Sequence, residues 1–475
     1  MQGFRSVAAL VGGVLLGCSS VAPPRAQLVV YIDTTAPLPS QLAEDSSLSA
    51  DAAIDSVRID VLSELGTPLE TFEVAAPDAR DWPISFGAVA ADGASELRLR
   101  LRGFQARHAR RVDGAGDAPL EPLREVTIDR LVTLELPENA FQGALVMLEG
   151  DCLGRPARFG SAPLTCQDAA HLAEDPRQGV ALIDATQRPA TRAGTWLDAH
   201  EVPCRGAAHP GAICIPGGLS VLGDVVADDP VEDGRARTAP LRPVVLSPFW
   251  MDATEFTVGD YRAYAPGLKL AAPPVQAKPN GPLCTFAGDA DATHDDLPLN
   301  CVRWATAQAP CEAKGGSLSS EARWEHAARG RGQRRIFPWG DTDPSCCVAS
   351  LSRQNPQSKF PNECPGSGAE PVGSHPKSPD CPGGGDVSRD GVLDLGGSIS
   401  ELTLDSFAGY DQDCWRFAGV ARDPQCAVAG SNTHVSRGGQ WVEGFGFATV
   451  ALRYSNPPVE TFEGLGLRCV YEDTP

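Results

Sequence analysis

The sequence has few basic residues for its length. Its 475 residues include 40 Lys and Arg against 61 Asp and Glu, which gives a formal net charge of −21. A protein that binds a phosphate backbone needs a basic face, so the charge argues against a nucleic-acid partner. The surplus of acid favours the ordinary explanation, which is solubility through self-repulsion.

The sequence also lacks long apolar runs. It contains no stretch of eighteen apolar residues, the length at which a helix could cross a bilayer. The apolar run at residues 8–16 is short, follows the positive Arg5 and leads into "LLGC", which ends at Cys18. This order resembles the bacterial lipobox, in which the cysteine is lipidated. We therefore expect residues 1–18 to be a lipoprotein signal peptide and Cys18 the lipidation site. The anchor would make the membrane a partner, and Ser19 resembles the sorting signal for the outer membrane of the cell envelope.

The cysteines point to an oxidising compartment. Fifteen are present, and removal of the lipidated Cys18 leaves an even fourteen, enough for seven disulfides. Short spacings suggest the pairs Cys152 with Cys166 and Cys204 with Cys214. The adjacent Cys346 and Cys347 are expected to bond to different partners, and the overall connectivity does not follow from the sequence.

The chain divides into regions that differ in composition and hydrophobic pattern. Residues 27–150 hold alternating β-type runs separated by turn residues, which predicts an all-β sandwich of about seven strands. In "ELRLRLR" (Glu96 to Arg102) the arginines share one face, which is either a binding stripe or a solvated sheet face. The second interpretation is the simpler one. Residues 151–211 are predicted to be a Cys-containing connector with some docked structure.

Residues 212–473 carry a series of short motifs. In chain order these are "IPGG" (215–218), "PFWMDATEFT" (248–257), "PLNCVRW" (298–304), "LSSEARWEHAARG" (318–330), "FPWG" (337–340), "GVLDLGGSISEL" (391–402), "RGGQW" (437–441) and "GLR" (466–468). The order resembles the formylglycine-generating enzyme family, also called the sulfatase-modifying factor family. The resemblance implies an α+β fold like that of C-type lectins, with little regular secondary structure. It also implies a disulfide from the first helix to the last strand, Cys311 to Cys469.

The resemblance also locates the family's catalytic site. Its active members carry two cysteines after the arginine-glycine-glycine turn, which bind copper(I) and use oxygen to convert a substrate cysteine into formylglycine. Aligned on that turn, the two positions are Glu443 and Ala448 in this chain. Neither is a soft thiolate of the kind that copper(I) prefers, so copper is not expected and the oxidase activity is expected to be lost.

Calcium is the other metal that the resemblance implies. The family holds Ca²⁺ partly through the Asn and Glu of a Gly-Asn-Val-Trp-Glu motif, and this chain has Ser398 and Glu401 there. A hydroxyl is a weaker calcium ligand than an amide oxygen, so any calcium site is expected to be weakened.

Two functions remain open. The first is a non-catalytic binding or scaffold lipoprotein, with a pocket lined by Trp441, Phe445, Phe447 and Arg453 for an unknown protein, peptide or glycan. The second is an oxidoreductase-type enzyme of the same family that modifies a protein or a metabolite by altered chemistry. In that case Glu443 is the residue to suspect as a base or ligand, although a solvated loop carboxylate is the plainer interpretation.

Overall fold

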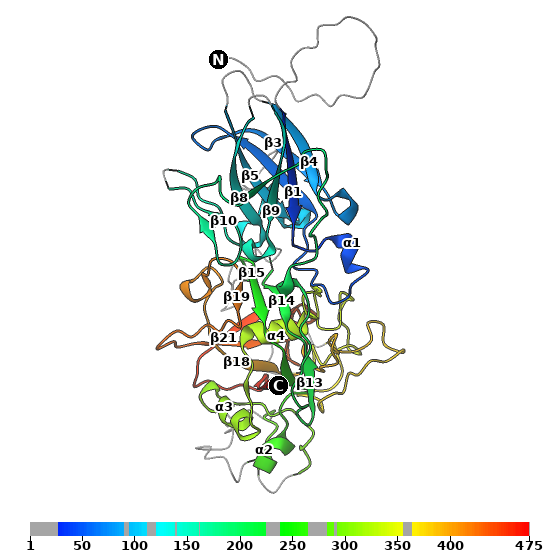
Figure 1. Ribbon diagram of the computed structural model, residues 1–475. Coiled ribbons are helices and arrows are strands. Elements are labelled where there is room, and N and C mark those ends of the chain that lie inside the picture. Colours follow the sequence, from blue (N-terminus) through cyan, green and yellow to red (C-terminus); the bar gives the residue numbers. More distant parts are fainter. Residues whose placement is uncertain are drawn as a thin grey trace, which may run out of the picture.

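The protein is described by a computed structural model over residues 27–89, 95–111, 120–137, 140–160, 162–224, 238–264, 283–288, 292–354 and 363–474. The expected signal peptide and Cys18 lie outside these residues. The molecule is elongated, with the sheets of the first 150 residues at one end and the C-terminal half at the other (Figure 1). Within the described ranges, no helix has the length and apolar character needed to span a membrane.

Two four-stranded sheets dominate the N-terminal half. The first has the order β12-β9-β1-β4 and contains β1 (Gln27–Thr34), β4 (Ile84–Val89), β9 (Phe141–Leu148) and β12 (Val180–Ile183). The second has the order β3-β2-β5-β8 and contains β2 (Ser56–Leu62), β3 (Pro68–Ala75), β5 (Glu96–Phe104) and β8 (Ile128–Glu135). Strand β1 runs parallel to β9, whereas the second sheet is antiparallel throughout.

One apolar core joins these two sheets. Alternate residues of β1, among them Val30 and Ile32, pack in the same cluster as Leu99 and Leu101 of β5. The alternation follows from the two-residue period of a strand, which turns every second side chain to the same face. The expected connector contributes to this unit, because β12 completes the first sheet and the buried Trp196 joins the cluster.

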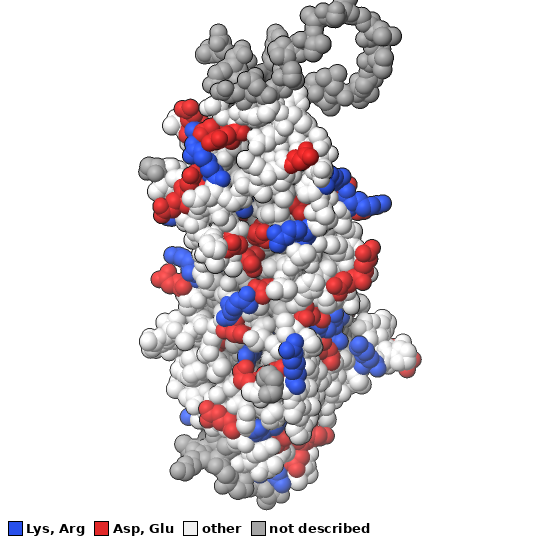
Figure 2. Space-filling view, in the orientation of Figure 1, with Lys and Arg blue, Asp and Glu red and all other residues white. Residues whose placement is uncertain are grey.

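The arginines of β5 are paired with acids. The ion pairs are Arg98 with Glu96 (3.1 Å), Arg100 with Asp129 (2.7 Å) and Arg102 with Asp60 (2.7 Å). Asp129 lies on the neighbouring strand β8 and Asp60 on β2, so the stripe is neutralised within its own sheet. On the face of the molecule that Figure 2 draws, blue and red side chains are likewise interspersed.

The C-terminal half is built from short elements around three small sheets. The sheets are β13-β16-β23-β17, β14-β15-β19 and β21-β20-β18-β22. Their strands are β13 (Ala212–Ile215), β14 (Gly218–Leu222), β15 (Arg242–Leu246), β16 (Phe249–Asp252), β17 (Ser317–Leu318), β18 (Ser400–Ser406), β19 (Ala421–Arg422), β20 (His434–Arg437), β21 (Arg453–Asn456), β22 (Leu465–Gly466) and β23 (Cys469–Glu472). The longer helices are α2 (Val258–Tyr264), α3 (Trp304–Ala313) and α4 (Glu321–Ala328). The described chain is thus rich in strands and has few helices.

Shorter elements complete the described chain. They are α1 (Pro39–Leu42) and the two-stranded sheets β6 (Ala109–Arg111) with β7 (Leu120–Pro122) and β10 (Thr165–Cys166) with β11 (Leu172–Ala173). All three lie in the N-terminal half or the connector, so they add nothing to the C-terminal site.

Seven disulfides staple the structure. They join Cys152–Cys166, Cys204–Cys214, Cys284–Cys301, Cys311–Cys469, Cys346–Cys364, Cys347–Cys381 and Cys414–Cys426. The three pairs that the sequence singled out are among them, and the adjacent Cys346 and Cys347 have different partners. Cys311 to Cys469 ties helix α3 to strand β23 across 158 residues of sequence.

The two halves meet through buried polar contacts. Asp51, near the base of the N-terminal sheets, forms an ion pair with Arg334 and accepts a hydrogen bond from the backbone N of Val221 (2.8 Å). The Ser49 hydroxyl donates to the carbonyl of Leu219 (2.8 Å). Leu219 belongs to the core cluster of the two N-terminal sheets, so apolar packing also continues across the junction.

Candidate functional site

Helix α4 is the element around which the C-terminal site is built. Its N-cap is Ser320, whose hydroxyl accepts a hydrogen bond from the backbone N of Arg323 (3.2 Å). Asp405 adds a second cap by accepting from the backbone N of Glu321 (2.7 Å). Nearly every residue of the helix is buried, including the polar Glu321 and Glu325. Buried carboxylates require partners, because their desolvation is costly.

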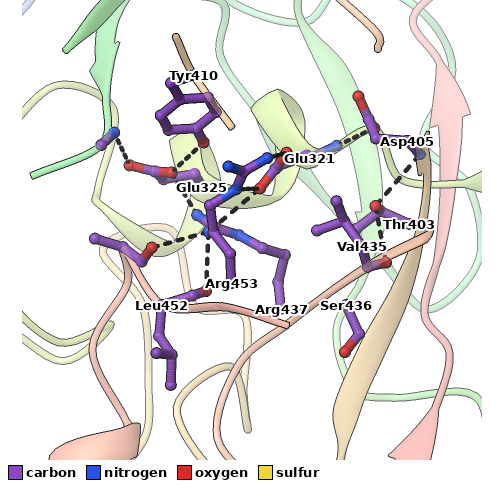
Figure 3. Close-up of polar contacts among 12 residues, drawn as sticks. Glu321, Glu325, Thr403, Asp405, Tyr410, Val435, Ser436, Arg437, Leu452 and Arg453 are labelled. Carbon is purple, nitrogen blue, oxygen red and sulfur yellow. Dashed lines mark hydrogen bonds and ion pairs between the residues drawn. The ribbon is translucent and has the colours of Figure 1, made fainter. Parts of the chain in front are cut away.

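Two arginines supply those partners. Arg453 forms a two-pronged ion pair with Glu321, with 2.7 Å between Nη2 and Oε2, and Arg437 forms an ion pair with Glu325. All four side chains are fully buried. Figure 3 shows both arginines rising from the strands below to meet the two carboxylates on α4, beside the ring of Tyr410. The Arg453 guanidinium lies 4.0 Å from the centre of that ring.

These ion pairs fix both ends of the segment between Arg437 and Arg453. Arg437 also donates hydrogen bonds to three carbonyls of the same segment, those of Val450 (2.8 Å), Ala451 (3.1 Å) and Leu452 (2.9 Å). The loop is therefore closed on itself and held to α4 at each end. Its shape is set by buried charge, independently of any catalytic group.

The electrostatics of the network differ between its acids. Burial works against ionisation of Glu325, yet the charges of Arg329 and Arg437 lower its pKa below the ordinary value, so it is a carboxylate. In Asp405 the compensation by the backbone hydrogen bonds from Glu321 and Cys426 and by the charge of Arg453 is incomplete. Burial and the neighbouring charge of Glu321 raise the pKa of Asp405 to about 7.

Glu443 and Ala448, which the resemblance aligns with the family's two cysteines, lie inside this loop. Glu443 is buried, with 6% of its surface exposed, and accepts a hydrogen bond from the Tyr454 hydroxyl. The interpretation of Glu443 as a solvated loop carboxylate is therefore wrong. Ala448 is also buried, in an apolar cluster that contains Phe337 and the disulfide-bonded Cys381. The space beside Ala448 is filled by these neighbours.

The pocket expected from four side chains of this segment does not form as such. Trp441 and Arg453 are fully buried. Their polar groups have partners inside the protein: Trp441 donates to the carbonyl of Glu463 (3.1 Å), and Arg453 forms an ion pair with Glu321. Only Phe445 and Phe447 are half-buried, at the ends of a short 3-10 turn. Two of the four residues thus face the interior and support the loop.

The residues at the expected calcium position do not fit that role. Glu401 accepts from the indole N of Trp324 (2.7 Å) through one oxygen and from Arg468 (2.8 Å) through the other. Both oxygens therefore already have donors, and Ser398 is buried in a left-handed turn (φ 65°). Among the residues that the structure describes, no group of three or more His, Cys, Asp or Glu side chains is placed to hold a metal ion.

The sequence places Asp386 and Asp394 in one short segment, but it does not predict that Glu255 joins them near Arg468. The three acids thus come from two separate segments, and all of them are buried. Burial and the charge of Asp394 raise the pKa of Asp386 to about 8, so that acid is largely protonated at neutral pH. No local spacing could have revealed this group, because only the fold brings the segments together.

A disulfide-bonded loop lies next to the filled cysteine position. Cys347–Cys381 closes it, and His375 anchors it. The two ring nitrogens of His375 lie 2.9 Å from an oxygen of Glu370 and 3.1 Å from the carbonyl of Cys347. Both neighbours are acceptors, so the imidazolium form satisfies both contacts. Burial opposes that charge, but the hydrogen bonds to Glu370 and to the Cys347 carbonyl raise the pKa of His375.

Replacement of Glu325 tests the buried network. Glu325→Gln removes the near counter-charge of the buried Arg437 and also that of Arg329, and it leaves Arg437 only a longer contact with Glu321 (3.5 Å). We therefore expect the free energy of unfolding to fall by about 3–5 kcal/mol. Urea denaturation measures the change. Asp413→Asn is the control, because its pair with Arg416 is exposed and should have little effect. A Glu325→Gln loss as small as that of the control would contradict the anchoring role.

His375 makes stability depend on pH. Its folded pKa is raised above the ordinary 6.5, so its contribution is complete below that value and is lost as the pH rises through the folded pKa. The difference in unfolding free energy between the wild-type chain and His375→Gln should therefore be larger at about pH 5.5 than at about pH 8.5. The exposed His171→Gln serves as control. A difference that stays constant with pH would show that the anchor is not the imidazolium.

Comparison with known proteins identifies relatives of the C-terminal half. A bovine (Bos taurus) protein named inactive C-alpha-formylglycine-generating enzyme 2 is 26% identical over 292 residues, covering 54% of this chain and 86% of the relative. A mouse (Mus musculus) formylglycine-generating enzyme is 26% identical over 310 residues, covering 55% of this chain and 75% of the relative. The solved structure of PvdO from Pseudomonas aeruginosa matches with a TM-score of 0.41 and 22% identity, covering 55% of this chain and 94% of that one.

The sequence profile of one family covers more than half of the chain. It is described as the sulfatase-modifying factor enzyme 1-like domain and matches residues 199–473, which include helix α4, the arginine network, Glu443 and Ala448. The chain therefore belongs to the sulfatase-modifying factor family.

Proposed function

We propose that this protein is a cell-envelope lipoprotein whose sulfatase-modifying factor domain binds a ligand without oxidising it. The observation that carries the proposal is the state of the sulfur atoms. Fourteen of the fifteen cysteines are joined in seven disulfides, and the remaining Cys18 lies outside the described residues. Copper(I) chemistry of the family's type needs thiolates, and a disulfide sulfur is not one.

The surroundings of the two former cysteine positions support the same conclusion. Ala448 is packed against apolar side chains, and Glu443 is engaged by Tyr454. The fold around them is held by the ion pairs of Arg437 and Arg453, none of which depends on a metal. The domain can therefore keep its family shape after the loss of its chemistry.

One observation favours the alternative of an enzyme with altered chemistry. Glu443 is a buried carboxylate at a position where active relatives carry a catalytic cysteine, and its partner Tyr454 is a second titratable group. Such a pair is suited to proton transfer. The neighbouring space is closed by the cluster around Ala448, however, which leaves the binding function better supported.

The N-terminal half suits a role in presentation. Its sheets contact the C-terminal half through Asp51, Ser49 and a shared core, so the two parts are joined without a loose linker between them. We propose that the lipid on Cys18 attaches this unit to the outer membrane. The sheets would then hold the C-terminal domain away from the lipid surface.

The absence of oxidase activity can be measured directly. The purified full chain should bind no stoichiometric copper by metal analysis and should leave a Cys-x-Pro-x-Arg peptide unchanged in mass, because no thiolate is available to hold the metal. A catalytically active family member assayed alongside is the positive control. Conversion of the peptide, or one bound copper or iron per chain, would overturn the binding function in favour of the enzyme.

The lipid anchor has its own test. The chain expressed in a Gram-negative host should fractionate with membranes and carry acyl chains on Cys18, as read by mass spectrometry of the N-terminal peptide. Cys18→Ser should release it into the soluble fraction with an unchanged fold, because the seven disulfides of the described residues do not involve Cys18. Equal membrane association of the variant and the wild-type chain would contradict the anchor.

A further inference from the structure

A surface pocket lies beside the filled cysteine position. Its volume is about 330 Å³, and its walls include Trp339, Lys377, Ser378 and the three successive glycines of residues 383–385. The volume falls at the small end of the range for ligand sites. Lys377 and Ser378 belong to the loop closed by Cys347–Cys381, and the glycines follow shortly after Cys381, which packs in the same cluster as Ala448. The end of this loop and the segment that follows it thus shape the pocket.

Trp339 gives the pocket a rigid aromatic wall. Its ring stacks on Phe337, with 5.1 Å between the ring centres and an angle of 4°. Its indole N–H, the one hydrogen-bond donor of the side chain, donates to the carbonyl of Thr342 (2.9 Å). A ligand can therefore contact only the half-buried aromatic surface of Trp339. Such a surface is electron-rich on its face and attracts the C–H groups of a saturated ring or a cation.

The glycine wall has room for a ligand because it has no side chains. All three glycines have positive φ angles, between 87° and 112°. A Cβ on Gly385 would lie 2.3 Å from the carbonyl oxygen of Pro376, so this position requires glycine. A Cβ on Gly384 would meet nothing within 4 Å, which shows that this part of the wall faces open space. The backbone N of Gly384 donates to the carbonyl of Cys381 (2.9 Å), and the carbonyls of Gly384 and Gly385 each accept one backbone hydrogen bond. Each of these carbonyls keeps a second lone pair that a ligand hydroxyl can use.

Lys377 supplies the charge of the pocket. Of the two lysines in the described part of the chain, Lys314 forms an ion pair with Asp252, whereas Lys377 is exposed and has no hydrogen bond or ion pair there. An ammonium at the wall of this site disfavours a cationic ligand, although the aromatic face alone would accept one. The same group favours a carboxylate.

These three walls together point to one ligand class. A saturated ring satisfies Trp339, ring hydroxyls suit the glycine wall, and a carboxylate on the ring suits Lys377. We propose that the pocket binds a uronic acid unit of an acidic polysaccharide. The inference rests on the proposed binding function and gives that function a ligand.

Isothermal titration of the full chain with trigalacturonate tests the ligand class. We expect saturable binding that Trp339→Ala and Lys377→Gln each weaken roughly tenfold or more, which is the loss of one sizeable interaction. Arg416→Gln is the matched control, because it removes an exposed cation of the same domain outside the pocket and should bind as the wild-type chain does. Trp339→Phe keeps a flat ring and should retain most of the affinity. Circular dichroism and thermal melting establish that each variant is folded.

Several outcomes would overturn the inference. They are no saturable heat with trigalacturonate, equal affinity for neutral maltotriose, equal affinity for triglutamate, or wild-type affinity in both pocket variants. Maltotriose tests the charge and triglutamate tests the sugar ring. The copper and peptide measurements report on the binding function separately, since a chain that fails to bind trigalacturonate and also lacks oxidase activity refutes only the ligand.

Discussion

The C-terminal half depends on four charges that water cannot reach. Glu321 and Glu325 on one short helix meet Arg453 and Arg437 from the two ends of a loop, and all four side chains are fully buried. Burial of a charge is unfavourable unless its partner has good geometry and its remaining hydrogen bonds are satisfied. Here the bidentate Arg453 pair, the carbonyls around Arg437 and the ring of Tyr410 provide that environment.

This arrangement separates the shape of the loop from its chemistry. The anchors lie at Arg437 and Arg453, whereas Glu443 and Ala448 lie between them. Substitutions at Glu443 and Ala448 therefore leave the anchors untouched. Glu443 accepts a hydrogen bond from Tyr454, and Ala448 lies in an apolar cluster. A loop held in this way can change the residues between its anchors and keep its fold.

Sequence reasoning predicted some of this well and missed the rest for physical reasons. The motifs predict the position of the domain, because each one forms a strand, a turn or a helix cap from residues that are close together in sequence. The sequence predicts Arg453 in a pocket wall, whereas its partner Glu321, 132 residues away in sequence, holds it in the interior. The burial of Glu443 cannot be predicted either, because a loop of glycines and phenylalanines gives no local sign of it. The protonation of the acids near Arg468 and the free charge of Lys377 could not be predicted from the sequence either. Both depend on whether residues that are distant in sequence supply a counter-charge.

The position of strand β23 has a consequence for biosynthesis. This strand lies inside its sheet, between β16 and β17, and Cys469 at its start bonds to α3. The core of the C-terminal half therefore stays incomplete until residues 469–472 have left the ribosome and Cys469 has bonded to Cys311. The first N-terminal sheet, in contrast, needs nothing beyond β12, which ends at Ile183. The order of synthesis thus favours folding of the N-terminal half first. Its surface around Asp51 then stays exposed until the C-terminal half, which is made later, folds against it.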